Sequence, residues 1–93
     1  MNSLPQNVQP YKCTKTFSQD TVPTGFLAEH STKAGVWAKL NVETGSLVFV
    51  ITESGEEEEL LITPESPAII APEQQHHVRL DDSEVTFYLE FFK

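Results

Sequence analysis

Apolar and polar residues alternate with a period of two along most of this chain, which is the pattern of half-buried β-strands. About eight short runs carry it, and their spacing of roughly eight to twelve residues is typical of a β-sandwich or barrel. The runs are Tyr11–Phe17, Phe26–His30, Val36–Val42, Leu47–Thr52, Glu59–Thr63, Ala68–Ala71, His76–Leu80 and Glu84–Phe92. No segment has a convincing helical stripe, so the sequence predicts an all-β domain.

Turn-forming residues lie between the predicted strands. Residues 22–25 suit a type II turn, because Pro23 presets its φ and Gly25 accepts a positive φ. Further turns are expected at Glu43–Ser46 and at Ser54-Gly55, both as hairpins, and then at Thr63–Pro67 and Asp81–Ser83. The domain is expected to span residues 11–93, preceded by an irregular arm over residues 1–10.

The alternation also predicts which strands are central and which face of each is buried. One face of the third run carries Val36, Ala38, Leu40 and Val42. Residues 47–51 are apolar on both faces, as in the central strand of a sandwich. Residues 85–92 are similar, except for Thr86 and Glu90. A carboxylate in so apolar a strand must be partnered, protonated or close to an edge.

Length and charge limit the partners that we expect. A chain of 93 residues suits one domain, and 39% hydrophobic residues suffice for a core. The net charge is −8, and the six basic residues form no run, which argues against nucleic acid and against anionic membrane surfaces. With one cysteine, no apolar stretch long enough to cross a bilayer and no signal-peptide pattern, we expect a cytoplasmic protein.

The three histidines are the most informative polar residues. His30 is in phase with Phe26, and His76 shares a face with Val78, so two inward imidazoles could meet inside one small β-domain. Glu90 would then be a third ligand, and two histidines with one carboxylate are a known ligand set for Zn²⁺ or Fe²⁺. The alternative is that each imidazole lies at a strand end, solvated or hydrogen-bonded to the backbone.

Two segments of the chain resemble a known family. Residues 30–42 (HSTKAGVWAKLNV) with Gly45-Ser46-Leu47 look like the opening block of the TehB/YeaR-like domain family. Residues 72–76, with the pattern Pro-Glu-x-x-His, look like its second block, and residues 21–23 and 89–92 also fit. The resemblance extends from about Tyr11 to Lys93.

The resemblance implies a single cupin-like jelly roll, a double-stranded β-helix of about eight short strands. It also implies an association with tellurite and other oxyanions or with nitrosative stress, either as a stand-alone protein or as the N-terminal domain of a tellurite-resistance methyltransferase. Methyl transfer is not carried over, because the methyltransferase half is expected to be missing from this chain. The usual four-ligand cupin site is not expected either, because the first motif keeps only His30. In the second motif the pattern favours His76 over His77.

The function that we expect from these observations is a non-catalytic or accessory binding domain for a small ligand or a divalent metal (Zn or Fe). The metal ligands would be His30, His76 and Glu90, and Trp37, Glu73 and His77 would line the ligand pocket. The chain is expected to form a homodimer through uncovered strand edges. Two alternatives stay open. One is a small metal-dependent enzyme of the cupin type. The other is a dimeric interaction module that docks on a methyltransferase or another partner near Trp37.

Overall fold

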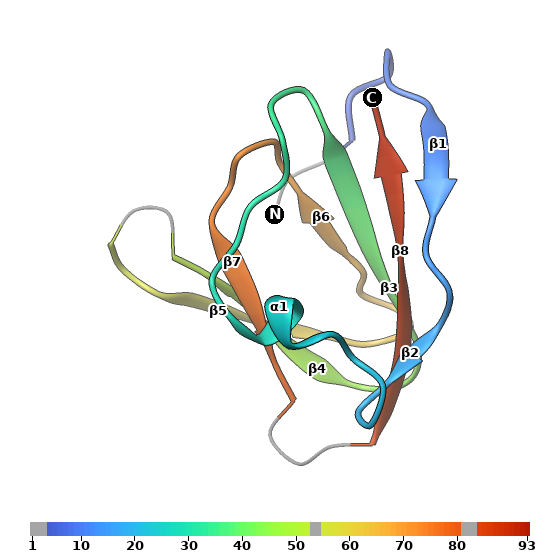
Figure 1. Cartoon of the computed structure of the whole chain (residues 1–93), viewed down its shortest axis with the longest axis vertical. Helices are drawn as coiled ribbons and strands as arrows, with labels where there is room; N and C mark the ends of the chain where they lie inside the picture. Colours follow the sequence, from blue (N-terminus) through green and yellow to red (C-terminus); the bar gives the residue numbers. More distant parts are fainter. Residues whose placement is uncertain (1–3, 53–54, 81–83) are drawn as a thin grey trace.

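Figure 1 shows the computed structural model of the chain, which describes residues 4–52, 55–80 and 84–93. Within these ranges the chain forms eight strands and one helical turn, which confirms the all-β prediction. The elements are β1 (Pro10–Cys13), β2 (Phe17–Ser18), α1 (Thr24–Leu27), β3 (Trp37–Gly45), β4 (Leu47–Ile51), β5 (Glu58–Ile62), β6 (Ala68–Ile70), β7 (His76–Arg79) and β8 (Val85–Phe92).

The strands form two antiparallel sheets. One has the order β1-β8-β3-β6, with β2 paired to β8 outside this path, and the other has the order β5-β4-β7. The strands with two apolar faces are the central ones, as predicted, because β8 pairs with β1, β2 and β3, and β4 lies between β5 and β7. The jelly-roll topology and the homodimer stay predictions.

The hairpin expected at residues 43–46 is wrong. Strand β3 continues to Gly45, where it pairs with Val85 of β8, and β4 begins at Leu47 in the other sheet. Gly45 has a φ of +78°, and a Cβ added there would lie 2.0 Å from the carbonyl oxygen of Glu84. Two strands that alternate strongly on either side of a glycine therefore form a corner between the sheets instead of a hairpin.

The predicted strand Phe26–His30 and the type II turn before it are also wrong. Residues 24–27 form the one turn of α1, and Gly25 does not take a positive φ. Only His30 of that run pairs like a strand residue, through an isolated bridge. The predicted first strand is divided into β1 and β2, and the segment Asp81–Ser83 lies outside the described residues.

The core lies between the two sheets and is formed by the faces that the alternation predicts. Ala38, Leu40 and Val42 of β3 are buried, and Phe87 of β8 and Phe49 of β4 are almost completely buried. Within the described residues, no helix is both long and apolar enough to cross a membrane. The cytoplasmic location stays a prediction.

Candidate functional site

The backbones of His30 and His76 pair directly, although 45 residues separate them in the sequence. The N–H of each donates to the carbonyl oxygen of the other, both at 2.9 Å. Residues paired in this antiparallel way point their side chains to the same face. The two imidazole rings therefore lie side by side, with their centroids 4.2 Å apart.

The backbone also determines which ring nitrogen carries the proton. Nδ1 of His30 lies 2.9 Å from the carbonyl oxygen of Ala28, and Nδ1 of His76 lies 2.7 Å from that of Gln74. Because a carbonyl oxygen only accepts hydrogen bonds, each Nδ1 must donate. In the neutral form, Nε2 of each ring is then an acceptor, which is the tautomer that metal-binding histidines usually adopt.

His76 is a buried and neutral base at physiological pH. His76 is only 2% exposed, and the centroid of its ring lies 5.1 Å from that of the Phe49 ring. Burial lowers the pKa of His76 to about 4, with further lowering from the nearby His30 and His77 and opposition from the hydrogen bond to Gln74. The ring thus presents an uncharged acceptor.

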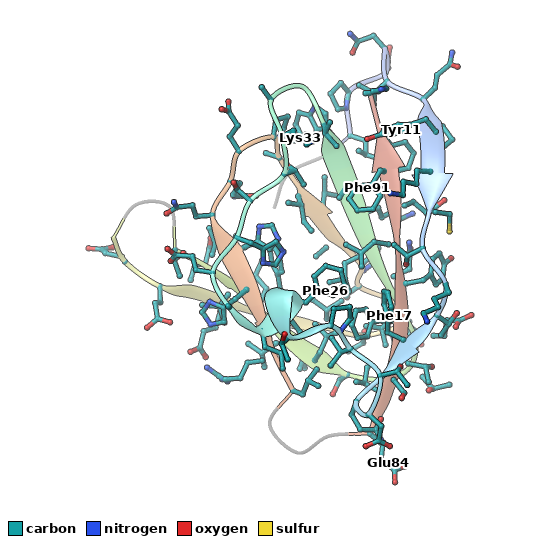
Figure 2. All side chains as sticks on the ribbon, in the orientation of Figure 1. Tyr11, Phe17, Phe26, Lys33, Glu84 and Phe91 are labelled. Atoms are coloured by element: carbon teal, nitrogen blue, oxygen red, sulfur yellow. The ribbon has the colours of Figure 1, made fainter. Side chains whose placement is uncertain are left out.

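The imidazole pair lines a cavity of about 320 Å³. Figure 2 shows four of the lining residues, Tyr11, Phe26, Lys33 and Phe91, around the opening between β1, β8 and the segment that precedes β3. The lining residues come from both sheets and from α1. They are Tyr11, Lys12, Phe26, His30, Ser31, Thr32, Lys33, Val36, Ala38, Ile70, His76, Leu89 and Phe91.

Strand alternation and one irregularity bring these side chains to the cavity. Leu89 and Phe91 lie on the same face of β8, two residues apart, as alternation requires. On β1 the pairing with β8 shifts register between Pro10 and Lys12. Both Tyr11 and Lys12 line the cavity, although neighbours on a regular strand face opposite ways.

The segment that carries Ser31, Thr32 and Lys33 is held by the turn before β7. The N–H of Glu73 donates to the carbonyl oxygen of Thr32 at 3.2 Å and to its Oγ1 at 3.3 Å. The hydroxyl of Thr32 donates in turn to the carbonyl oxygen of Ala71 at 3.3 Å. Glu73 has a φ of +61°, so an unusual backbone conformation aims its N–H at this segment.

The structure brings together two of the six residues predicted for the site, His30 and His76. Glu90 lies on the opposite face of β8 from Leu89, where it accepts a hydrogen bond from Asn41 Nδ2 at 3.0 Å. That contact supplies the partner that a carboxylate in an apolar strand requires.

The other three predicted pocket residues do not line the cavity. Trp37 lies between Val36 and Ala38, which do line it, and therefore faces the other way. His77 follows His76 on β7 and likewise faces away from the cavity. Glu73 is exposed, and its contribution to the site is the backbone N–H described above.

The donor set falls one ligand short of a resident zinc or iron site. Protein zinc sites generally use three or four protein ligands. Across residues 4–52, 55–80 and 84–93, no three His, Cys, Asp or Glu side chains are grouped so as to hold a metal ion. The two imidazoles have the correct tautomer for a metal, but the carboxylate expected to complete the set is hydrogen-bonded elsewhere. The metal stays a prediction.

The sequence did not predict that two lysines, Lys12 and Lys33, line the cavity. The alternation already placed Val36 with Ala38 on the inner face, which was a usable signal for that wall. Lys12 and Lys33 had no comparable signal, because one depends on the register shift of β1 and the other lies in a segment without strand pairing.

Comparison with known proteins shows where this architecture occurs. The family model of the TehB-like domain matches residues 12–89. Two relatives, from Haemophilus influenzae strains Rd and 10810, are each named probable S-adenosyl-L-methionine-dependent methyltransferase TehB. They are 38% and 37% identical to this chain over 81 residues, which is 82% of this chain and 28% of each relative.

Solved structures agree with this match. The crystal structure of TehB from Haemophilus influenzae superimposes with a TM-score of 0.84 at 32% identity, over 94% of this chain and 32% of that chain. A protein from Escherichia coli strain K12 superimposes with a TM-score of 0.85 at 27% identity, over 100% of this chain and 97% of that chain. The chain thus spans less than a third of the TehB proteins and nearly all of the Escherichia coli protein.

Proposed function

The chain belongs to the TehB-like domain family, and on that premise we propose that it is a small-molecule-binding domain whose ligand occupies the cavity beside His30 and His76. The role is binding, not catalysis. The resemblance to tellurite-resistance proteins favours a task in the response to oxyanion or nitrosative stress.

The observation that carries this proposal is a preformed cavity lined by two paired imidazoles. Ligand sites are typically concave, mostly apolar and provided with a few fixed polar groups. Here the apolar wall includes Phe26, Ile70 and Leu89, and backbone hydrogen bonds fix the tautomer of both imidazoles. Rigid placement of these groups reduces the entropy lost on binding.

The chemical groups that line the cavity suit holding a ligand. They are imidazoles, two hydroxyls, two ammonium groups and the phenol of Tyr11. The relatives named as methyltransferases are more than three times as long as the matched segment, so we propose that a domain of this kind acts beside a catalytic partner or domain in them.

A screen of a fragment library by ¹H–¹⁵N NMR tests this proposal. We expect hits whose shift changes cluster on the residues that line the cavity, above all Thr32, Val36 and His76. The variant Val36→Trp fills the cavity wall and should abolish those hits. Val48→Trp is the matched control, because Val48 is equally half-buried but lies on β4, away from the cavity.

Hits that cluster elsewhere, or hits that persist in Val36→Trp, would show that the cavity is not the ligand site. Zinc chloride is titrated in the same experiment to test the metal prediction. Zinc that binds the wild type and His77→Ala, but not the double variant His30→Ala/His76→Ala, would establish the imidazole pair as a metal site.

A further inference from the structure

The lining of the cavity concentrates positive charge in a strongly negative chain. Two of the six basic residues, Lys12 and Lys33, line it. None of the acidic residues in the described ranges does, although the whole chain contains 14. Lys93 adds a third cation nearby, since its Nζ lies 4.4 Å from the ring centroid of Tyr11, another lining residue. A lining of this kind attracts anions.

Lys33 lies toward one end of the cavity, and the imidazole pair lies nearer the other. In Figure 2, Lys33 and Tyr11 are at the upper end of the opening and Phe26 is below them. The ring of His30 lies 5.6 Å from that of Phe26, which places the imidazole pair beside the lower end. Lys33 and the imidazole pair would therefore contact different ends of a bound molecule.

The imidazole end requires a donor from its ligand. Nδ1 of each histidine is engaged with a backbone carbonyl, so a neutral ring offers only the lone pair of Nε2. His76 in particular resists protonation because it is buried. The lone pair of a neutral ring would repel an anionic group and bind an O–H or N–H group.

Between these two ends the wall is apolar. Val36, Ala38, Ile70, Leu89 and Phe91 all line the cavity, and the first four have aliphatic side chains without a polar group. A ligand that fills this space must have a hydrocarbon body, because polar atoms placed there would lose water without gaining a partner.

We propose, on the basis of the binding function proposed above, that the ligand is a small organic acid. Its carboxylate faces Lys12 and Lys33, its hydrocarbon body lies along β3 and β8, and an O–H or N–H group at its far end donates to the imidazole pair. The ligand class is thus a hydroxy acid or an amide-bearing acid of a size that the cavity admits.

Isothermal titration calorimetry at pH 7 and low salt tests the assignment with three hydroxy acids of graded size: glycolate, 3-hydroxybutyrate and 4-hydroxybenzoate. Each is compared with its uncharged amide, and 4-hydroxybenzoate is also compared with benzoate. We expect at least one acid to bind about tenfold more tightly than its amide, since charge-assisted hydrogen bonds are the stronger ones. We expect benzoate, which lacks the hydroxyl, to bind about tenfold more weakly than 4-hydroxybenzoate.

Three variants assign these preferences to residues. Lys12→Met/Lys33→Met should remove the preference for the acid over its amide. Lys39→Met is the control for charge, because Lys39 lies on the face of β3 that does not line the cavity. His30→Phe keeps a ring beside Phe26 and should reduce the advantage of the hydroxyl, because His76 is then the one imidazole of the pair left to accept from it.

The outcomes separate this assignment from the binding function itself. Amides that bind as tightly as the acids, or equal losses in Lys39→Met and in the double lysine variant, overturn the organic-acid assignment while the cavity remains a ligand site. Failure of all three acids at millimolar concentration also overturns it. If fragment hits also miss the cavity, the binding function fails too.

Discussion

A single buried side chain, His76, shows how this protein sets the chemistry of its cavity. Its ring lies against His30 and Phe49, and its Nδ1 donates to the carbonyl oxygen of Gln74. These contacts remove water from the imidazole without supplying an anion to stabilise its cation. The residue therefore keeps a neutral acceptor facing the cavity at a pH where an exposed histidine begins to be protonated.

This arrangement makes stability depend on pH through His76. Its pKa is about 4 in the folded state and about 6.5 when unfolded. The unfolded chain therefore binds the proton first as the pH falls, so the stabilisation is complete above about pH 6.5 and is lost progressively toward pH 4. The loss amounts to about 3 kcal/mol.

Urea denaturation at pH 7.5 and pH 4.5 measures this contribution as a difference between proteins. The stability advantage of the wild type over His76→Asn should shrink by about 2–3 kcal/mol at the lower pH. His77→Asn is the control and should follow the wild type, because His77 does not line the cavity. A constant difference between wild type and His76→Asn at the two pH values would contradict this account.

At the scale of the elements, the connections between the two sheets position the site. The chain passes from β3 in one sheet to β4 in the other at Gly45 and Ser46. It passes back between β5 and β6 through the turn in which Thr63 bridges Ser66. Because of these crossings, β7 lies beside the segment around His30, and His30 can bridge His76.

Gly45 and Gly35 form a matched pair for testing the corner. Both have a positive φ, of +78° and +79°, but only at Gly45 would an added Cβ meet the backbone, at 2.0 Å from the Glu84 oxygen. Gly35→Ala should cost about 1 kcal/mol, from the positive φ alone. Gly45→Ala should cost about 3 kcal/mol or more, because the backbone of β3 or β8 must also move.

Chemical denaturation of the two alanine variants measures both losses. Equal destabilisation would show that the close approach to Glu84 does not constrain the corner. A larger loss in Gly45→Ala together with weaker ligand binding would connect the corner to the shape of the cavity.

At the scale of the whole molecule, the cavity is a space that the two sheets leave unfilled at one end. Occupation of such a space by a ligand favours the folded state by mass action. At a ligand concentration of about 100 times Kd the gain is about 2.7 kcal/mol, which corresponds to roughly 14 °C in Tm for a domain of this length.

Thermal unfolding followed by circular dichroism checks this with the acid that binds most tightly in calorimetry. Tm should rise with the logarithm of its concentration in the wild type and in Val48→Trp, and stay constant in Val36→Trp. An equal rise in Val36→Trp would mean that the stabilisation comes from a surface other than the cavity.

The fold and the imidazole pair illustrate what can be predicted from such a sequence. The inward faces of β3 and β7 were readable because alternation is a local property, and His76 was assigned to the buried face correctly. His30 was assigned to the inner side through a strand that does not exist, since residues 24–27 are helical. The two imidazoles nevertheless lie 4.2 Å apart, because the bridge to His76 orients His30.

The roles of Glu90, Trp37 and His77 stay predictions, because the position of each relative to the cavity is set by the tertiary structure. Glu90 is predicted as the third ligand beside two histidines, and in the structure its carboxylate accepts a hydrogen bond from Asn41. Trp37 and His77 were proposed for their chemistry, and their immediate neighbours occupy the cavity instead.

The amino-acid order by itself determined most of the strands, the buried face of several of them and the family, because period-two patterning and short family-like segments are readable within a few residues. The tertiary structure alone decided which sheet each strand joins, where the cavity lies and which lysines line it. Those outcomes depend on corners, on one register shift and on pairings between segments far apart, and no local pattern contains the geometry of such contacts.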